Sequence, residues 1–320
     1  GDAAGGGNLR RFSYDEDVMK DNSANILNGI DLGKLRRVAL SLNAQLVNLK
    51  YEATLPDVVT GQPLYFAVIP ELISALPAKD AKQRHGTCAV VGNSGSLLGG
   101  SFGDAIDDHD AVFRIHNAPT RRYEAQVGSK TTYQVLNPFW ADELLKVGEQ
   151  RANNNNWVHE GAQLVLWSLY SQETFLELKT NFPSTQITLV NPQFTQSVAS
   201  AAEIMQGRIE AITEAGLGLD TTGSGGGGGS GSGSFSSTLF SVAMALESCG
   251  KVDLYGVDMR YGKYLYYDSH EVASSEREAS SLEFLIFLVL RANGLVASIN
   301  EGRAEAEGAG GDGGGDGGGQ

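Results

Sequence analysis

The sequence predicts an α/β fold: a single Rossmann-like domain in which a mostly parallel sheet is flanked by helices. Short apolar runs bounded by glycine or polar residues recur along the chain, which is the pattern of strands buried on both faces. Helical stretches separate these runs, and such alternation is typical of parallel sheets. A chain of 320 residues can also bury the large core that this architecture needs.

The expected strands and helices follow one another along the chain. The apolar run CAVV at 88–91 predicts the first buried strand, and AVFRI at 111–115 predicts the second. Apolar residues at three- and four-residue spacing predict a helix over 236–246, with Ser236 as its N-cap. The other expected elements are strands at 163–167, 186–190 and 251–256, and helices at 197–207 and 278–292.

Composition separates the ends of the chain from the expected domain. Glycine-rich ends carry few side chains with which to form a core, so both ends are expected to be disordered. A glycine-serine run is expected to be an insertion in a surface loop, tolerated because loop-closure entropy grows slowly with length. In order, the expected parts are a disordered start (1–8), a stem or accessory segment (9–85), the α/β domain (86–300) with its low-complexity insertion (223–235), and a disordered tail (301–320).

The charge of the chain limits its partners. A formal net charge of −14 argues against nucleic acid and against docking on anionic lipid through general electrostatics. The longest uninterrupted apolar run, at 284–290, is too short to span a bilayer, and no signal peptide is visible at the start. A soluble cytosolic protein fits this composition as well as a lumenal one does.

A glycine-containing loop follows the first predicted strand. Its residues Gly92, Asn93, Ser94 and Gly95 are small, so the backbone can approach a phosphate or a sugar closely at a strand end. The spacing of the glycines does not match the G-x-G-x-x-G loop of dinucleotide-binding proteins. The loop alone is therefore a weak signal for any one ligand.

The longer segment 88–120 resembles the large, donor-binding sialyl motif of the eukaryotic sialyltransferases, glycosyltransferase family 29. In that family a cysteine, a VVGN loop, an acidic-His-Asp step and an Arg-x-Asn-x-Ala-Pro element recur in the order found here, and VGSKTT at 127–132 also fits. The resemblance implies a GT-A-like variant of the Rossmann-like sheet, with Asn93, Ser94 and Gly95 against the donor. His116 stands where the family has asparagine, and Asn117 follows it, so both are candidates to hold the nucleotide.

The segment 236–256 is similar to the small sialyl motif of the same family, which reads as a Ser/Thr-Thr-Gly loop, an apolar helix, a cysteine and a V-D-x-Y-G strand; the helix, the cysteine and the strand match here. The loop register is open. Ser236, Ser237 and Thr238 are favoured as donor-binding residues over Thr222 and Gly223. The resemblance also implies a disulfide between the two cysteines of the chain, Cys88 and Cys249, and hence an oxidising lumen.

Two further stretches carry the candidate catalytic groups. Residues 264–268 resemble the third motif of the family, with Tyr266 and Tyr267 offering phenols to the leaving phosphate or simply alternating on a strand end. The last motif, His-x-x-x-x-Glu, is approximated by His270 as general base and Glu276, one residue too far along. A second alignment places Glu278 at the histidine of the motif and Glu283 at its glutamate.

The resemblance implies an inverting, metal-independent transfer of sialic acid from CMP-sialic acid to a hydroxyl of a glycan on a glycoprotein or glycolipid. No cofactor is expected, and the acidic-His-Asp step at 107–110 is expected to be a turn, not a metal site. The implied location is the Golgi lumen, as a type II membrane protein whose anchor is absent from the given residues. Two alternatives stay open: a plant- or algal-type relative using CMP-Kdo or a UDP-sugar, and a catalytically inert nucleotide- or glycan-binding relative.

Overall fold

The computed structural model describes residues 4–35, 38, 52–77, 84–167, 171–217, 235–259, 264–270, 272 and 274–302. Its centre is a seven-stranded sheet in which every strand pair is parallel, which confirms the predicted fold class. The strand order is β7-β6-β5-β4-β3-β8-β9. The strands are β3 (His85–Val91), β4 (Ala111–Ile115), β5 (Tyr133–Leu136), β6 (Gln163–Leu166), β7 (Ile187–Leu189), β8 (Cys249–Tyr255) and β9 (Ser298–Asn300).

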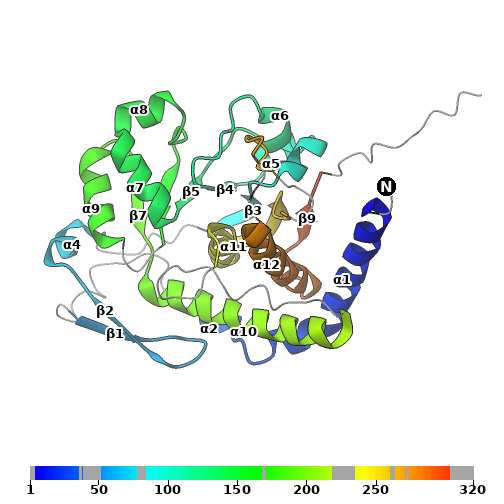
Figure 1. Cartoon of the computed structure of the whole chain (residues 1–320). Helices are drawn as coiled ribbons and strands as arrows, with labels where there is room; N and C mark the ends of the chain where they lie inside the picture. The colour runs from blue at the N-terminus through cyan, green and yellow to red at the C-terminus, as the bar shows by residue number, and fades with distance from the viewer. Residues whose placement is uncertain are drawn as a thin grey trace, which may run out of the picture.

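Helices cover the sheet in two groups, which Figure 1 shows apart from each other: α11 and α12 with α10 and α1, and α7, α8 and α9 at the β7 end. Alternate residues of a strand point to opposite faces of the sheet. Val90 accordingly joins the core under α10, α11 and α12, whereas Val91 packs with η1 and α5. The larger helices are α1 (Ala4–Leu27), α7 (Pro138–Val147), α9 (Gln172–Asn181), α10 (Pro192–Leu217), α11 (Ser237–Ser248) and α12 (Ser274–Ala292); the shorter ones are α2 (Leu32–Leu35), α4 (Pro70–Ala75), η1 (Gly95–Gly99), α5 (Gly103–Asp107), α6 (Glu124–Val127) and α8 (Glu149–Asn154).

All five strands expected from the sequence are present, but two strands of the sheet were not expected. β5 contains Gln134, a polar residue that interrupts the apolar pattern and is nevertheless fully buried. β9 has three residues and no fully buried side chain, so it carries little sequence signal. A separate antiparallel hairpin of β1 (Glu52–Pro56) and β2 (Pro63–Ala67) was also not expected.

The N-terminal part corrects the predicted organisation. α1 begins at Ala4, so residues 4–8 are helical and not disordered as their composition predicts. Met19 and Ile26, seven residues apart on one face of α1, are fully buried in the same core as β3, and Glu16 of α1 forms an ion pair with Arg291 of α12. Helix α1 therefore packs into the same core as the central sheet. The glycine-serine run at 223–234 and the tail from 303 lie outside the described residues.

A disulfide joins the two central strands of the sheet. Cys88 of β3 is bonded to Cys249 at the start of β8, with 6.0 Å between their Cα atoms, and the two strands are neighbours in parallel register. This confirms the predicted pairing. Among the described helices none combines the length and the hydropathy required to cross a bilayer.

Candidate functional site

The order of the strands places the candidate site. From β3 the chain adds strands in one direction out to β7, then returns to place β8 and β9 on the other side of β3. Ligands of open α/β sheets bind beyond the carboxyl ends of the strands at such a reversal. The predicted large motif leaves β3 and β4 at this edge, and the small motif includes β8, so the topology brings the two together.

The loop after β3, residues 92–95 (the β3 loop), lies against the turn after β8. Gly92 is required there because a Cβ atom at this position would lie 2.2 Å from the carbonyl oxygen of Gly256. The Ser94 backbone N donates to the Gly256 oxygen at 3.1 Å, and the Ser94 hydroxyl donates to the Asp258 oxygen at 2.6 Å. Asn93 carries a buried Oδ1 without a hydrogen-bond partner among the described residues. The loop is thus held by its backbone and by Ser94, which leaves Oδ1 of Asn93 able to accept a hydrogen bond.

The segment 264–268, which resembles the third family motif, pairs with the β3 loop. The N–H of Gly95 donates to the Tyr264 oxygen at 2.8 Å, and the N–H of Tyr266 donates to the Asn93 oxygen at 3.1 Å. The Tyr266 side chain is buried, and its hydroxyl donates to the Pro119 oxygen at 2.7 Å. Tyr267 is only partly buried, and its hydroxyl lies 3.5 Å from Nδ2 of Asn93. Of the two tyrosine hydroxyls predicted to contact the donor, that of Tyr267 therefore lies beside the Asn93 side chain, whereas that of Tyr266 is bound to Pro119.

His116 and Asn117 occupy the turn after β4. His116 has a φ of 55°, in the left-handed region that asparagine and histidine both adopt more readily than most residues, so histidine can stand where the family has asparagine. Its Nε2 lies 2.9 Å from the Ser237 hydroxyl, and its ring stacks on Trp140 with 5.6 Å between centroids. Burial lowers the pKa of His116 to about 3, so the imidazole is neutral at physiological pH. Asn117 again has a buried Oδ1 to which no group in the described part of the chain donates.

The N-terminus of α11 faces this turn. Ser236 is the N-cap, as predicted, and its hydroxyl accepts from the N–H groups of Thr238 and Leu239 at 3.1 and 3.2 Å. The Ser237 hydroxyl also receives the indole N–H of Trp167 at 3.3 Å. The small-motif residues Ser236, Ser237 and Thr238 therefore begin the helix beside His116. Thr222 and Gly223, the alternative donor-binding residues, lie outside the described residues.

Glu283 of α12 reaches the same helix end. It is 5% exposed, and its carboxylate accepts from the Ser236 N–H at 2.6 Å and from the Ser236 hydroxyl. Burial raises the pKa of Glu283 to about 7 against the opposing effect of the Ser236 hydrogen bonds. The second alignment of the last motif singles out this glutamate. The side chains of Glu276 and Glu278, earlier in α12, lie outside the described part of the chain.

The predicted general base, His270, lies on the surface. Its side chain is 90% exposed, and its Nδ1 lies 2.6 Å from Oδ1 of Asp268. That carboxylate also receives the His270 backbone N–H at 2.9 Å, which lowers the pKa of Asp268. The structure shows no contact between His270 and the cluster formed by Asn93, His116 and Ser237.

Several residues of the site were missed by sequence reasoning. The side-chain amide of Gln134 on β5 donates to the backbone oxygens of His116 and Trp157, each at 2.6 Å, and so holds the turn after β4 in place. Trp140 and Trp167 contact the imidazole of His116 and the hydroxyl of Ser237. The available signal was a polar residue inside an apolar run: a buried amide must find partners, and here they belong to the site.

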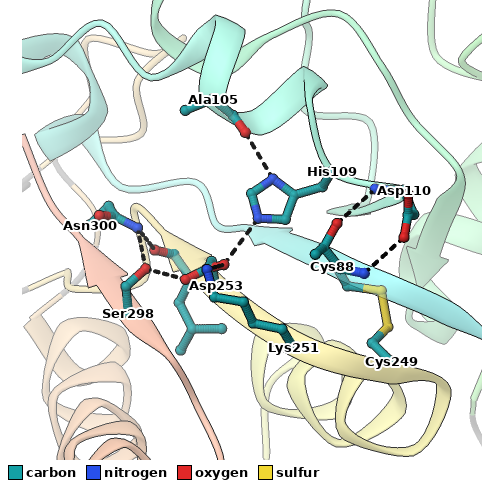
Figure 2. A network of polar contacts seen from close by, with 11 residues as sticks. Cys88, Ala105, His109, Asp110, Cys249, Lys251, Asp253, Ser298 and Asn300 are labelled. Atoms are coloured by element: carbon teal, nitrogen blue, oxygen red, sulfur yellow. Dashed lines mark hydrogen bonds and ion pairs between the residues drawn. A yellow bond between two sulfur atoms is a disulfide. The ribbon is translucent and has the colours of Figure 1, made fainter.

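The acidic-His-Asp step joins the two motifs structurally. Figure 2 shows His109 between the oxygen of Ala105, 2.8 Å from Nδ1, and Oδ2 of Asp253 on β8, 3.1 Å from Nε2. Asp253 is also paired with Lys251 at 3.0 Å and bonded by Ser298. Over the described residues no group of three or more His, Cys, Asp or Glu side chains could hold a metal ion. His109 thus joins the large motif to β8, the strand of the small motif.

Comparisons with known proteins complete the description of the site. The profile of the family described as glycosyltransferase family 29 (sialyltransferase) matches residues 41–295. A beta-galactoside alpha-2,6-sialyltransferase 2 of Danio rerio is 29% identical over 197 residues, 55% of this chain and 37% of that protein. The beta-1,6-galactosyltransferase GALT29A of Arabidopsis thaliana is 51% identical over 57 residues, 18% of this chain and 14% of that protein. The chain thus spans well under half the length of these curated relatives.

The solved structures similar to this chain include that of a mammalian sialyltransferase in complex with Gal-beta-1-3GalNAc-ortho-nitrophenol. It is 21% identical with a TM-score of 0.45, over 84% of this chain and 92% of that one.

Proposed function

This chain belongs to glycosyltransferase family 29, and on that premise we propose that it transfers sialic acid from CMP-sialic acid to a hydroxyl group of an acceptor glycan. The observation that supports this most directly is the pair of buried amide oxygens of Asn93 and Asn117 at the reversal of strand order, neither of which has a hydrogen-bond partner within the described ranges. A buried acceptor without a partner is rare and costs about 1–3 kcal/mol, so each oxygen calls for a donor from a ligand. The ribose hydroxyls and cytosine amino group of CMP supply such donors.

The N-terminus of α11 supplies the complementary site for negative charge. Its helix dipole points its positive end at the turn that carries His116, and sialic acid has a carboxylate that such an end attracts. The neutral imidazole of His116 holds Ser237 in place by the hydrogen bond between them. In the proposed complex Ser236, Ser237 and Thr238 face the sugar, and Asn93, Ser94, Gly95, His116 and Asn117 face the nucleotide.

The proposed reaction is a direct displacement with inversion. The acceptor hydroxyl oxygen forms a bond to the anomeric carbon while the bond from that carbon to the CMP phosphate oxygen breaks, and its electron pair leaves with CMP. His270 takes the proton of the hydroxyl on Nε2. The contact with Asp268 fits His270 for this role, because a carboxylate bound to the protonated Nδ1 leaves Nε2 able to accept the proton of the acceptor hydroxyl. Glu276 completes the proposed last motif. The leaving group carries a single phosphate. In the proposed reaction the hydroxyl of Tyr267 and the N-terminus of α11 stabilise its charge, so no metal ion is needed.

Transfer of a different sugar is the second candidate function. The relative from Arabidopsis thaliana is named as a galactosyltransferase, and His116 replaces an asparagine expected to hold the nucleotide. A UDP-sugar or CMP-Kdo is then the donor, in the same site. For either function we propose the Golgi lumen as the location and a type II anchor outside these residues. The disulfide supports an oxidising compartment.

The experiment is a donor comparison with the disulfide-intact protein. CMP-sialic acid, CMP-Kdo and UDP-galactose are each supplied with a β-galactoside acceptor, and the product and the released nucleotide are both measured. Binding of CMP and UMP is measured separately by calorimetry. We expect transfer from CMP-sialic acid. Transfer from another donor alone would replace the proposed donor, and nucleotide binding without turnover of any donor would support the inert alternative.

A further inference from the structure

We propose that Glu301, which lies beyond the family motifs, is a positioning residue that holds the β3 loop in its nucleotide-binding geometry. The inference rests on the proposed function, because it concerns the same nucleotide site. Glu301 follows β9 directly and falls where composition predicted the start of a disordered tail. The contacts of its carboxylate instead tie three segments together.

The carboxylate of Glu301 joins the turn after β8 to η1. Its Oε1 accepts from the N–H of Val257 at 2.7 Å and from the N–H of Asp258 at 3.0 Å. Its Oε2 accepts from the hydroxyl of Ser96, in the first turn of η1. One side chain therefore satisfies two backbone donors after β8 and one hydroxyl donor directly after the β3 loop.

The connection continues from Asp258 to the β3 loop. The same residue whose N–H donates to Glu301 accepts, at its carbonyl oxygen, the Ser94 hydroxyl at 2.6 Å. Ser94 is the neighbour of Asn93, whose unpartnered Oδ1 is a proposed nucleotide contact. Glu301 is thus linked to the ligand-facing amide through two hydrogen bonds and one peptide bond.

The residues on either side of Glu301 also make close backbone contacts with the turn after β8 and with η1. The N–H of Gly256 donates to the Asn300 oxygen at 3.0 Å. A Cβ atom on Gly302 would lie 1.9 Å from the Ser96 oxygen and 2.9 Å from the N of Gly100, so only glycine fits where the chain crosses η1. The glutamate is therefore presented to η1 by backbone contacts on both of its sides.

Glutamine is the matched conservative replacement. Burial raises the pKa of the Glu301 carboxyl to about 8, so near neutral pH it is largely protonated, and the proton on Oε2 then points to the hydroxyl oxygen of Ser96. A glutamine has the same length; its Oε1 can accept from Val257 and Asp258, and its Nε2 can donate to the Ser96 oxygen. Alanine removes all of these bonds. A positioning role predicts that glutamine restores what alanine loses.

The test compares Glu301→Ala, Glu301→Gln and Ser96→Ala, with Glu71→Ala, at an exposed position of α4, as the control. The probe is CMP, measured by calorimetry, together with donor KM, acceptor KM, kcat and Tm. We expect alanine at 301 to weaken CMP binding and raise the donor KM by about tenfold or more, since it leaves buried backbone donors unpaired. We expect glutamine to stay within about threefold of wild type, and the acceptor KM to stay unchanged in both variants.

Each outcome bears on one proposal. If wild type binds no nucleotide, the proposed function fails. If wild type binds CMP and the alanine variant binds it equally well, the positioning role fails while the function stands. If Glu301→Ala does not fold, Ser96→Ala decides, because it removes one end of the same contact: weakened CMP binding at unchanged Tm supports the role, and unchanged binding overturns it.

Discussion

Replacing Glu283 by glutamine removes a pH dependence of folding stability that the wild-type chain carries. The carboxyl group is 5% exposed, and its described partners are the N–H and hydroxyl of Ser236. Burial raises its pKa to about 7, above the ordinary value of 4.5. Because both partners are donors, they favour the charged form, but burial outweighs them.

The sign and size of the effect follow from that shift. A carboxyl group whose pKa is higher in the folded chain binds its proton more tightly there, so its protonation stabilises the fold. This contribution is fully present below about pH 4.5 and is lost as the pH rises through about 7. A pKa difference of about 2.5, from 4.5 to 7, at about 1.4 kcal/mol for each pKa unit, corresponds to about 3 kcal/mol.

The assay is urea unfolding of wild type and Glu283→Gln at intervals from pH 4.5 to 8.5. The difference between the two free energies of unfolding isolates Glu283, because the buried histidines His116 and His159, whose pKa values are lowered by burial, titrate in both proteins. We expect wild type to lose about 3 kcal/mol relative to the variant across this range. Glu71→Gln, at an exposed position of α4, is the control. Parallel pH curves for wild type and Glu283→Gln would refute the reasoning.

Three further predictions concern the disulfide, the base and the nucleotide. Replacing both Cys88 and Cys249 by alanine should lower the free energy of unfolding by about 5 kcal/mol, because the bond closes a loop with a sequence separation of 161; equal urea midpoints without reductant would contradict this. Changing His270 to alanine should lower kcat by about 10²- to 10⁴-fold with CMP affinity unchanged, and an unaltered kcat would exclude it as the base. Replacing Asn93 by alanine should weaken CMP binding about tenfold in calorimetry, whereas Asn153→Ala on exposed α8 should not; equal losses would argue against a nucleotide contact at Asn93.

The sequence predicted those elements whose pattern is set by local burial. β4 has the predicted bounds because all five of its residues are buried and all but Arg114 are apolar. Arg114 itself satisfies part of its guanidinium on backbone oxygens of Val127 and Lys130, which a strand pattern does not reveal. β5 was missed for the same kind of reason: Gln134 is tolerated in the core because the carbonyl oxygens of His116 and Trp157 accept its N–H groups.

The candidate site divides in the same way. Ordered motifs placed Asn93, Asn117 and Ser237 in one site because each motif lies at a recognisable strand end or helix start. Glu283 was a candidate only in the second alignment of the last motif, and Glu301 was predicted to belong to the disordered tail. Their partners lie 47 and 205 residues away along the chain, on Ser236 and Ser96. No local pattern encodes a contact across such distances.

By itself the sequence determined the α/β class, the family and the pairing of the two cysteines, because each depends on residue types in a fixed order along the chain. Only the tertiary structure decided that α1 belongs to the core and that His270 lies on the surface beside Asp268. It also decided that the buried Glu283 contacts Ser236 and that the partly buried Glu301 contacts Ser96. These depend on which elements the parallel sheet brings side by side. The carboxylates were recognisable as site residues only once the donors that they satisfy were in place.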